Sequence, residues 1–155
     1  MKQKKIPLGI LLLTMTFIVG CTNQNLQNKP NNIKISKQNY TVFPADYDIS
    51  FMSGSGNHKR YTPTDEDIRK TIKLVEKFLG DKNEIRKLDE YKVQFFGYFN
   101  ERGEKIIWAN YFCDDDSKDW KKELVTVLDG GNCFFTVKIN LDTESVFDFR
   151  VNGVA

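Results

Sequence analysis

The chain has 155 residues, with 23 lysines and arginines against 21 aspartates and glutamates, so its formal charge at pH 7 is +2. Three of the basic residues, Lys2, Lys4 and Lys5, lie at the amino terminus, and residues 21–155 therefore carry a formal charge of −1. A near-neutral chain of this length lacks the positive field of a nucleic-acid binder, and it is long enough for one hydrophobic core but too short to predict two domains.

The first 21 residues have the pattern of an export signal. The three lysines precede an apolar run from Leu8 to Val19, and a cysteine stands at position 21. This run has about a dozen residues, whereas a membrane-spanning helix needs about 20. The sequence therefore predicts a cleaved signal peptide over residues 1–20 and no membrane-spanning helix.

The last four residues of this stretch, Ile18-Val19-Gly20-Cys21, resemble the lipobox of bacterial lipoproteins. The resemblance implies cleavage before Cys21, lipid on its sulfur and acylation, as with palmitate, of the new amino terminus. Because Thr22 stands where Asp retains lipoproteins in the inner membrane of enteric bacteria, the resemblance implies the outer membrane, or the outer face of the membrane in a bacterium that has only one. The expected location is thus the cell envelope, with the membrane as a partner through Cys21 and no nucleic acid.

Residues 22–39 are rich in Asn, Gln, Lys and Ser and have too little apolar surface to fold. As a flexible coil, this segment would span about 20–25 Å. The sequence predicts a tether here, and a single globular domain over residues 40–155.

An amphipathic helix of about 17 residues is predicted next. Thr62 and Pro63 are the expected N-cap and first helical residue, acidic residues follow in the first turn, and Gly80 is the expected terminator. Apolar residues recur at helical spacing between these ends, at Ile68, Ile72, Val75, Phe78 and Leu79.

Five β-rich stretches follow, at 91–100, 105–113, 124–128, 132–141 and 146–152. The connections contain turn residues, including Gly103 and Asp129-Gly130-Gly131, which predict hairpins. Consecutive strands with short turns predict a meander. The predicted fold is therefore α+β, with one amphipathic helix packed on an antiparallel meander of about five strands.

Alternation along the strands assigns their faces. In the last two strands one face is expected to carry Cys133, Phe135, Val137, Ile139 and Leu141, together with Phe147, Phe149 and Val151. The first two strands are apolar on both faces. A helix followed by an antiparallel meander, here over residues 62–152, resembles cystatin-like folds and, more loosely, PepSY-like modules of exported bacterial proteins. The glutamine-rich loop of cystatins is absent, so the resemblance does not imply protease inhibition.

The sheet face opposite the expected helix is predicted to gather large apolar side chains. They are Phe96, Tyr98, Ile106, Trp108, Phe112 and Phe134. Residues 40–52, read as an edge strand or an extended cover, either bury this face as a second core layer or leave it open as a binding surface. Trp120, in a polar connection, is a further candidate for a partner contact.

Cys113 and Cys133 leave two alternatives open. In an exported protein, two cysteines are first read as a disulfide. In a strict five-stranded meander, however, a strand at 124–128 would hold them about 20 Å apart, far beyond the reach of a disulfide. Either the two thiols are separate or the strand order differs from a strict meander.

No strong motif for catalysis, metals or cofactors is present. His58 has no second histidine or CxxC beside it, Gly54–Lys59 lacks the spacing of a phosphate loop, and Asp114–Asp116 with Asp119 fails the spacing of an EF-hand. The favoured hypothesis is a non-enzymatic envelope protein that binds a protein or a small ligand, with no cofactor and no metal. The alternatives are a small hydrolase-like enzyme, motivated by Cys113, His58 and the aspartates, and a structural component of an envelope complex.

Overall fold

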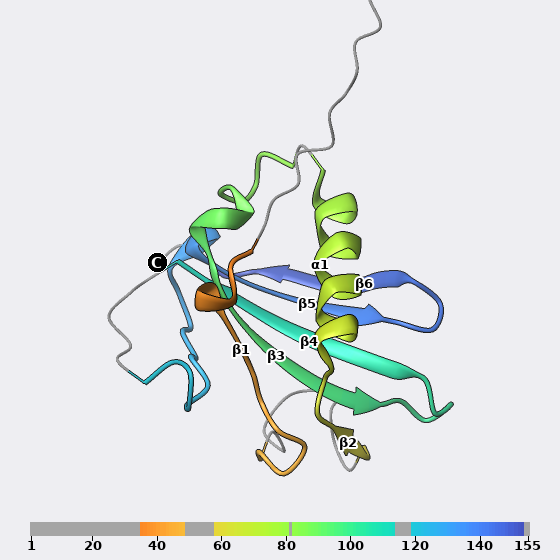
Figure 1. The fold of residues 1–155 in the computed structure, drawn as a ribbon. Helices are drawn as coiled ribbons and strands as arrows, with labels where there is room; N and C mark the ends of the chain where they lie inside the picture. Colours follow the sequence, from red (N-terminus) through yellow and green to blue (C-terminus); the bar gives the residue numbers. More distant parts are fainter. Residues whose placement is uncertain (1–34, 49–57, 81, 114–118, 154–155) are drawn as a thin grey trace, which may run out of the picture. The chain divides into compact units, whose positions relative to one another are not determined.

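One helix packs on a mostly antiparallel, six-stranded open sheet (Figure 1), which confirms the predicted α+β class. The computed structural model describes residues 35–48, 58–80, 82–113 and 119–153. The helix α1 spans Asp65–Leu79, and the strands are β1 (Tyr40–Val42), β2 (Arg60–Tyr61), β3 (Lys92–Phe99), β4 (Lys105–Phe112), β5 (Phe134–Asn140) and β6 (Ser145–Val151). Three short 3-10 helices are η1 (Lys37–Asn39), η2 (Leu88–Glu90) and η3 (Gly131–Cys133).

The expected signal peptide, Cys21 and most of the tether lie outside the described residues. Among the residues that are described, no helix is long and apolar enough to cross a membrane. The fold begins earlier than the predicted residue 40, because Ile35 packs against the main core and η1 leads directly into β1.

The helix α1 starts two residues later than predicted. Thr64, not Thr62, is the N-cap: its hydroxyl accepts a hydrogen bond from the Asp67 amide, and the Asp67 carboxylate accepts one from the Thr64 amide. This reciprocal capping box satisfies two backbone donors, whereas the Thr62 hydroxyl accepts a hydrogen bond from the Ala45 amide (3.0 Å). Gly80 ends the helix at φ +47°, as expected of a glycine terminator.

The sheet has the strand order β1-β3-β4-β5-β6, and β2 also pairs with β3. β1 runs parallel to β3, and the other pairs are antiparallel. The hairpin between β3 and β4 is confirmed, with Gly103 at φ +79°. The short β1 at the edge, followed by Phe43 and Pro44, confirms that this part of the 40–52 segment adds a strand to the edge of the sheet.

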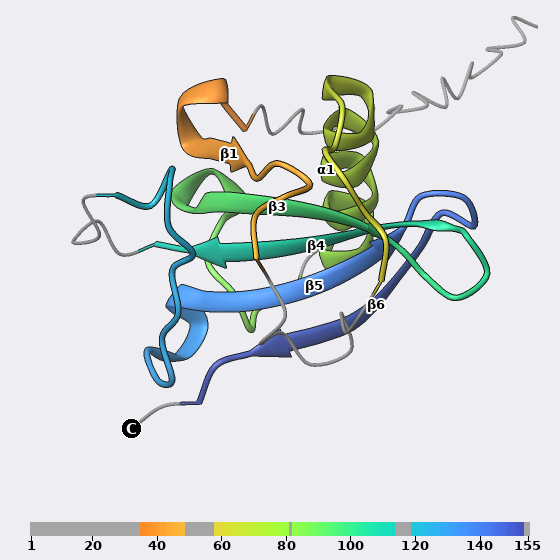
Figure 2. The same ribbon diagram turned by 90° about the horizontal axis from the view of Figure 1, so that it is seen from below.

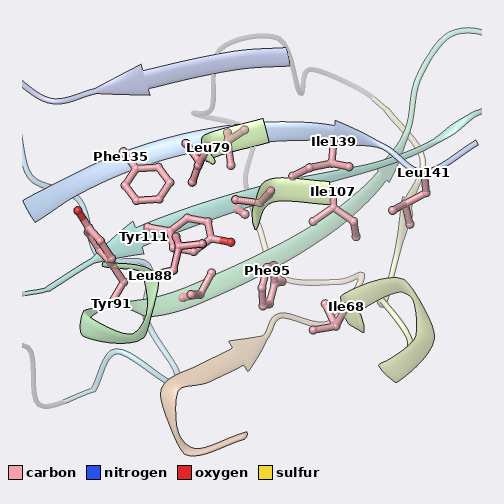
Figure 3. Close-up of a cluster of buried hydrophobic side chains, with 14 residues drawn as sticks. Ile68, Leu79, Leu88, Tyr91, Phe95, Ile107, Tyr111, Phe135, Ile139 and Leu141 are labelled. Carbon is pink, nitrogen blue, oxygen red and sulfur yellow. The ribbon is translucent and has the colours of Figure 1, made fainter. Parts of the chain in front are cut away.

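The main core lies between α1 and one face of the sheet (Figure 3), which we call the inner face. The rings of Tyr111 and Phe135 stack there with centroids 4.3 Å apart, and Tyr91 meets Phe135 edge to face. The predicted alternation is confirmed in β5 for the fully buried residues Phe135, Val137 and Ile139. The same cluster contains the fully buried residues of β3 and β4 on this face, which are Val93, Phe95, Ile107, Ala109 and Tyr111.

The predicted strand at 124–128 is wrong. β4 pairs directly with β5, so that Phe112 lies opposite Phe134, and residues 124–128 lie outside the sheet. Asp129-Gly130-Gly131 is accordingly not a hairpin turn but the entry to η3, with Gly130 at φ +97°. The apolar, β-branched sequence of 124–128 suits an extended chain, but the Val125 backbone forms its hydrogen bonds with the side chains of Gln94 and Asn110 and not with a neighbouring strand.

Phe147 lies on the face opposite to the predicted one. β6 carries a bulge, since two residues, Asp148 and Phe149, lie opposite the single position between Thr136 and Lys138. Asp148 adopts φ +51°, and the extra residue reverses the alternation before it. Val146, Phe149 and Val151 therefore pack on the inner-face core, whereas Phe147 is 42% exposed on the opposite face.

Candidate functional site

A long excursion between β4 and β5 covers part of the sheet face opposite α1, which we call the outer face. A disulfide joins Cys113, directly after β4, to Cys133, directly before β5. Their Cα atoms are 5.1 Å apart because the two strands are neighbours, and the 20 Å separation derived for a strict meander does not apply. The disulfide closes the excursion at its base. Figure 2 shows the described part, 119–133, crossing the ends of β4 and β5.

The register arranges the outer face as rows of side chains that cross the sheet. Residues paired across neighbouring strands share a face. One row is Gln94, Asn110, Thr136 and Arg150, and the next is Phe96, Trp108, Lys138 and Phe147. The first row is polar and can hold a covering chain by hydrogen bonds, whereas the second is largely apolar and can hold one by packing.

Gln94 fastens the excursion to the polar row. Its side chain is fully buried, and Nε2 donates hydrogen bonds to the carbonyl oxygens of Trp120 (2.5 Å) and Glu123 (2.7 Å). Its Oε1 accepts from the Val125 amide (2.9 Å) and from Asn110 Nδ2 (3.0 Å). All four hydrogen-bonding positions of this amide are thus used, which removes the cost of burying it.

Two further asparagines hold the same segment. Asn110 Nδ2 donates to the Val125 carbonyl (2.9 Å), and Asn152 Nδ2 donates to the carbonyls of Val127 (2.6 Å) and Asp129 (3.0 Å). The segment 124–127 is therefore positioned through its backbone, by amide side chains that belong to or follow β3, β4 and β6.

Aromatic side chains fill the space beneath the start of the excursion. Trp120 packs edge to face on Phe112, and both lie in a buried cluster with Phe134. Trp120 and Phe112, which were candidates for a binding surface, are thus buried in a small second core. The same holds for Phe96, because Phe43 stacks on it at 4.4 Å and Tyr47 lies beside both rings.

The predicted cover thus acts through Phe43 and Tyr47, whereas its last residues, 49–52, lie outside the described part of the chain. Tyr98 is also buried, and burial raises its pKa to about 12. Of the five aromatic candidates, Trp108 alone remains half-buried.

A hollow of about 210 Å³ lies beside Trp108. Outer-face residues of β4 and β5, the segment 124–127 and Asn152 line it, and the segment forms one of its walls. No charged residue of the described ranges lines it; the lining consists of Trp108, Asn110, Leu124, Val125, Thr126, Val127, Phe134, Thr136 and Asn152. An apolar site with a few neutral polar groups is the usual composition of a binding site for an uncharged group.

Charged groups stand beside this hollow. Arg150, which lies opposite Thr136, bonds Asp148 Oδ1 through Nε (2.7 Å), and Lys138 Nζ lies 2.8 Å from Asp148 Oδ2. The hydrogen bond from Lys138, supported by Arg150, holds the pKa of Asp148 below its usual range. The ionised Asp148 therefore joins two cations, and the group of three carries a net charge of +1.

The residues that motivated an enzyme are not brought together. Cys113 is bound in the disulfide, and His58 stacks on Tyr98 with ring centroids 5.5 Å apart. Tyr98 lies at the end of β3 far from Cys113, since Cys113 follows Phe112, which pairs with Lys92. Six residues of strand correspond to about 20 Å. Asp114–Asp116 lie outside the described residues, and within the described part no group of three or more His, Cys, Asp and Glu residues could hold a metal ion.

The residues that position the hollow, Gln94, Asn110 and Asn152, were missed by reading the sequence. The signal was a polar amide in the middle of each of two strands that are otherwise apolar. Comparison of the chain with protein-family models, with curated proteins and with solved structures gives no match. The fold and the site define an α+β domain with a disulfide-closed excursion that forms one wall of an apolar hollow.

Proposed function

We propose that this protein is a lipid-anchored component of the bacterial cell envelope, whose single domain binds an uncharged, apolar group in the hollow beside Trp108. The lipobox-like segment that ends at Cys21 supports the anchor and the location. The disulfide between Cys113 and Cys133 supports an oxidising compartment outside the cytoplasm.

The observation that carries the binding function is the construction of the hollow. Its wall is held by three amide side chains and by the disulfide at the base of the excursion, and it leaves Trp108 half-buried although the other aromatic candidates are buried. A wall fastened in this way keeps an apolar surface accessible in one shape, so little ordering is required when a ligand binds.

The anchor is tested by mass spectrometry of the protein purified from membranes and by the variant Cys21→Ser. We expect a mature chain that begins at Cys21 with added acyl mass, and we expect the variant to leave the membrane fraction. An unmodified Cys21, or a Cys21→Ser protein that stays on the membrane, would refute the anchor.

The hollow is tested with a small neutral probe, N-acetyl-leucine amide, and nuclear magnetic resonance of the labelled protein. We expect the probe to shift the Trp108 indole and the Thr136 amide, with a dissociation constant in the millimolar range that is ordinary for so few atoms. The variant Thr136→Met fills the hollow and should abolish the shifts. Glu101→Met, on an exposed turn, is the matched control and should leave them unchanged.

A further inference from the structure

The segment 124–127 has the hydrogen-bond alternation of an extended chain. Val125 uses its amide and its carbonyl toward Gln94 and Asn110, and the Val127 carbonyl accepts from Asn152. The Leu124 amide instead donates to the hydroxyl of Tyr47 (3.0 Å), which lies over Phe96 in the apolar row. In an extended chain, alternate residues direct their backbone groups to opposite edges. Residues 125 and 127 thus use one edge, and residues 124 and 126 the other.

Thr126 leaves this second edge open. The residue is exposed, and its amide and carbonyl form no hydrogen bond with any residue of the described ranges. Thr126 is itself a lining residue of the hollow, together with Trp108. An extended β-prone segment with one unpaired edge is a template for an added strand.

The edge of the main sheet is less suited to pairing. β6 carries the bulge at Asp148 and the exposed charge of Arg150, two features that disfavour strand addition. The segment 124–127 has neither a bulge nor a charged side chain. The open backbone at Thr126 and the uncharged hollow therefore occur together at one place on the outer face.

We propose that the occupant of the hollow is an extended segment of a partner polypeptide, which pairs with Thr126 as an added strand and places one uncharged apolar side chain against Trp108. This inference rests on the proposed function, because it names the ligand of the same site. A partner residue opposite Thr126 exchanges two backbone hydrogen bonds with it, and its side chain falls on the same side as that of Thr126.

Size and charge both fit one side chain on a peptide backbone. The volume of about 210 Å³ is below that of pockets for whole small-molecule ligands, which span about 300–1,000 Å³. None of the nine lining residues is charged, so the lining itself offers a charged side chain no opposite charge in exchange for its lost hydration. Leucine and phenylalanine are the residues expected opposite Thr126.

The test uses three probes with the full chain, purified from membranes in detergent. They are N-acetyl-leucine amide, the tripeptide acetyl-Thr-Leu-Thr-amide, and the same tripeptide with a methyl group on the leucine nitrogen. We expect the tripeptide to shift the Thr126 amide downfield and to slow its hydrogen exchange. N-methylation removes one backbone donor without changing a side chain, so it should weaken binding about fivefold or more.

Two variants of the protein separate backbone pairing from side-chain contact. Thr126→Pro removes the backbone amide of residue 126, and proline favours the extended conformation that is inferred for the preceding residue, Val125. In this variant the tripeptide should lose its advantage in affinity and bind no more tightly than N-acetyl-leucine amide. Thr126→Val keeps the amide and should retain that advantage. If Thr126→Pro does not fold, the N-methylated probe still decides the question.

The outcomes distinguish the two proposals. Equal binding of the tripeptide and its N-methylated form would overturn strand addition but leave the hollow as a binding site. A Thr126 amide that is already protected from exchange without any probe would also overturn it, because the edge would then be paired. If none of the three probes, at about 10 mM, shifted Trp108 or Thr136, the proposed function would fail as well.

Discussion

The replacement Gln94→Met tests whether one buried amide holds the wall of the hollow. Methionine has nearly the same length and shape as glutamine but cannot form its hydrogen bonds. Four partners would lose a bond: the carbonyls of Trp120 and Glu123, the Val125 amide and one hydrogen of Asn110 Nδ2. Asn110 would keep its bond to the Val125 carbonyl.

The structure allows the magnitude to be estimated group by group. Glu123 is exposed and Val125 is half-buried, so their backbone groups can recover water when Gln94 is removed. The hydrogen bonds of the Trp120 carbonyl and the Asn110 side-chain amide to Gln94 are buried, so each of these two groups, left without a partner, lowers the free energy of unfolding by about 1–3 kcal/mol. We therefore expect Gln94→Met to lower the free energy of unfolding by about 2–4 kcal/mol, and the melting temperature by about 10 °C.

Chemical denaturation measures the loss of stability, and acrylamide quenching of Trp120 in a Trp108→Phe background measures the opening of the wall. Gln38→Met is the matched control, since the Gln38 side chain is exposed and forms no described hydrogen bond. A loss below about 0.5 kcal/mol, together with an unchanged quenching of Trp120, would refute the view that Gln94 fastens the excursion.

Three further changes test other parts of the fold. Reduction of Cys113–Cys133, or its replacement by two serines, should cost about 3 kcal/mol in urea unfolding, because the closed loop spans 20 residues, and unfolded oxidised protein should show no thiol from this pair. Asp148→Asn removes the carboxylate at a position where asparagine also tolerates the positive φ. Because folding lowers the pKa of Asp148, its ionised form stabilises the fold, and the wild type should be more stable than the variant at pH 7. This difference in stability should vanish as the pH falls from the ordinary pKa of 3.8 to below the lower pKa of the folded protein. Thr64→Ala removes the N-cap of α1 and should cost about 1 kcal/mol by thermal unfolding, whereas Thr62→Ala should leave the N-cap hydrogen bonds intact.

The inner face could be predicted from the sequence because one rule governs it. The apolar residues of β3, β4 and β5 alternate with period two, and those of α1 recur at helical spacing, so both sets face a common core. The start of α1 shifted by two residues because Thr62 and Thr64 are both possible caps, and only the position of Asp67 decides between them.

The outer face could not be predicted in the same way, because its structure depends on distant contacts. The stretch 124–128 satisfies every local criterion for a strand, yet Gln94 and Asn110 take the place of a neighbouring strand. The predicted face of Phe147 was wrong because β6 contains a bulge, which changes the alternation, and no glycine in the sequence marks its position. The 20 Å separation of Cys113 and Cys133 was derived from a strand order that contained the strand at 124–128, so the disulfide stayed an open alternative until the direct pairing of β4 with β5 was known.

Backbone contacts of the excursion set the position of the hollow, whereas side chains set which ligand it binds. Gln94, Asn110 and Asn152 all bind the backbone of the excursion, so the place of the wall does not depend on the side chains that 124–127 carry. The occupant, in contrast, would meet Trp108 and Thr126 directly. Replacement of Thr126 by larger or smaller residues should therefore change which apolar probe binds best while stability stays nearly constant, and replacement of the amides should lower stability and weaken all probes alike. This separation follows only if the wall is held through its backbone, so a Thr126→Ala protein as unstable as Gln94→Met would contradict it.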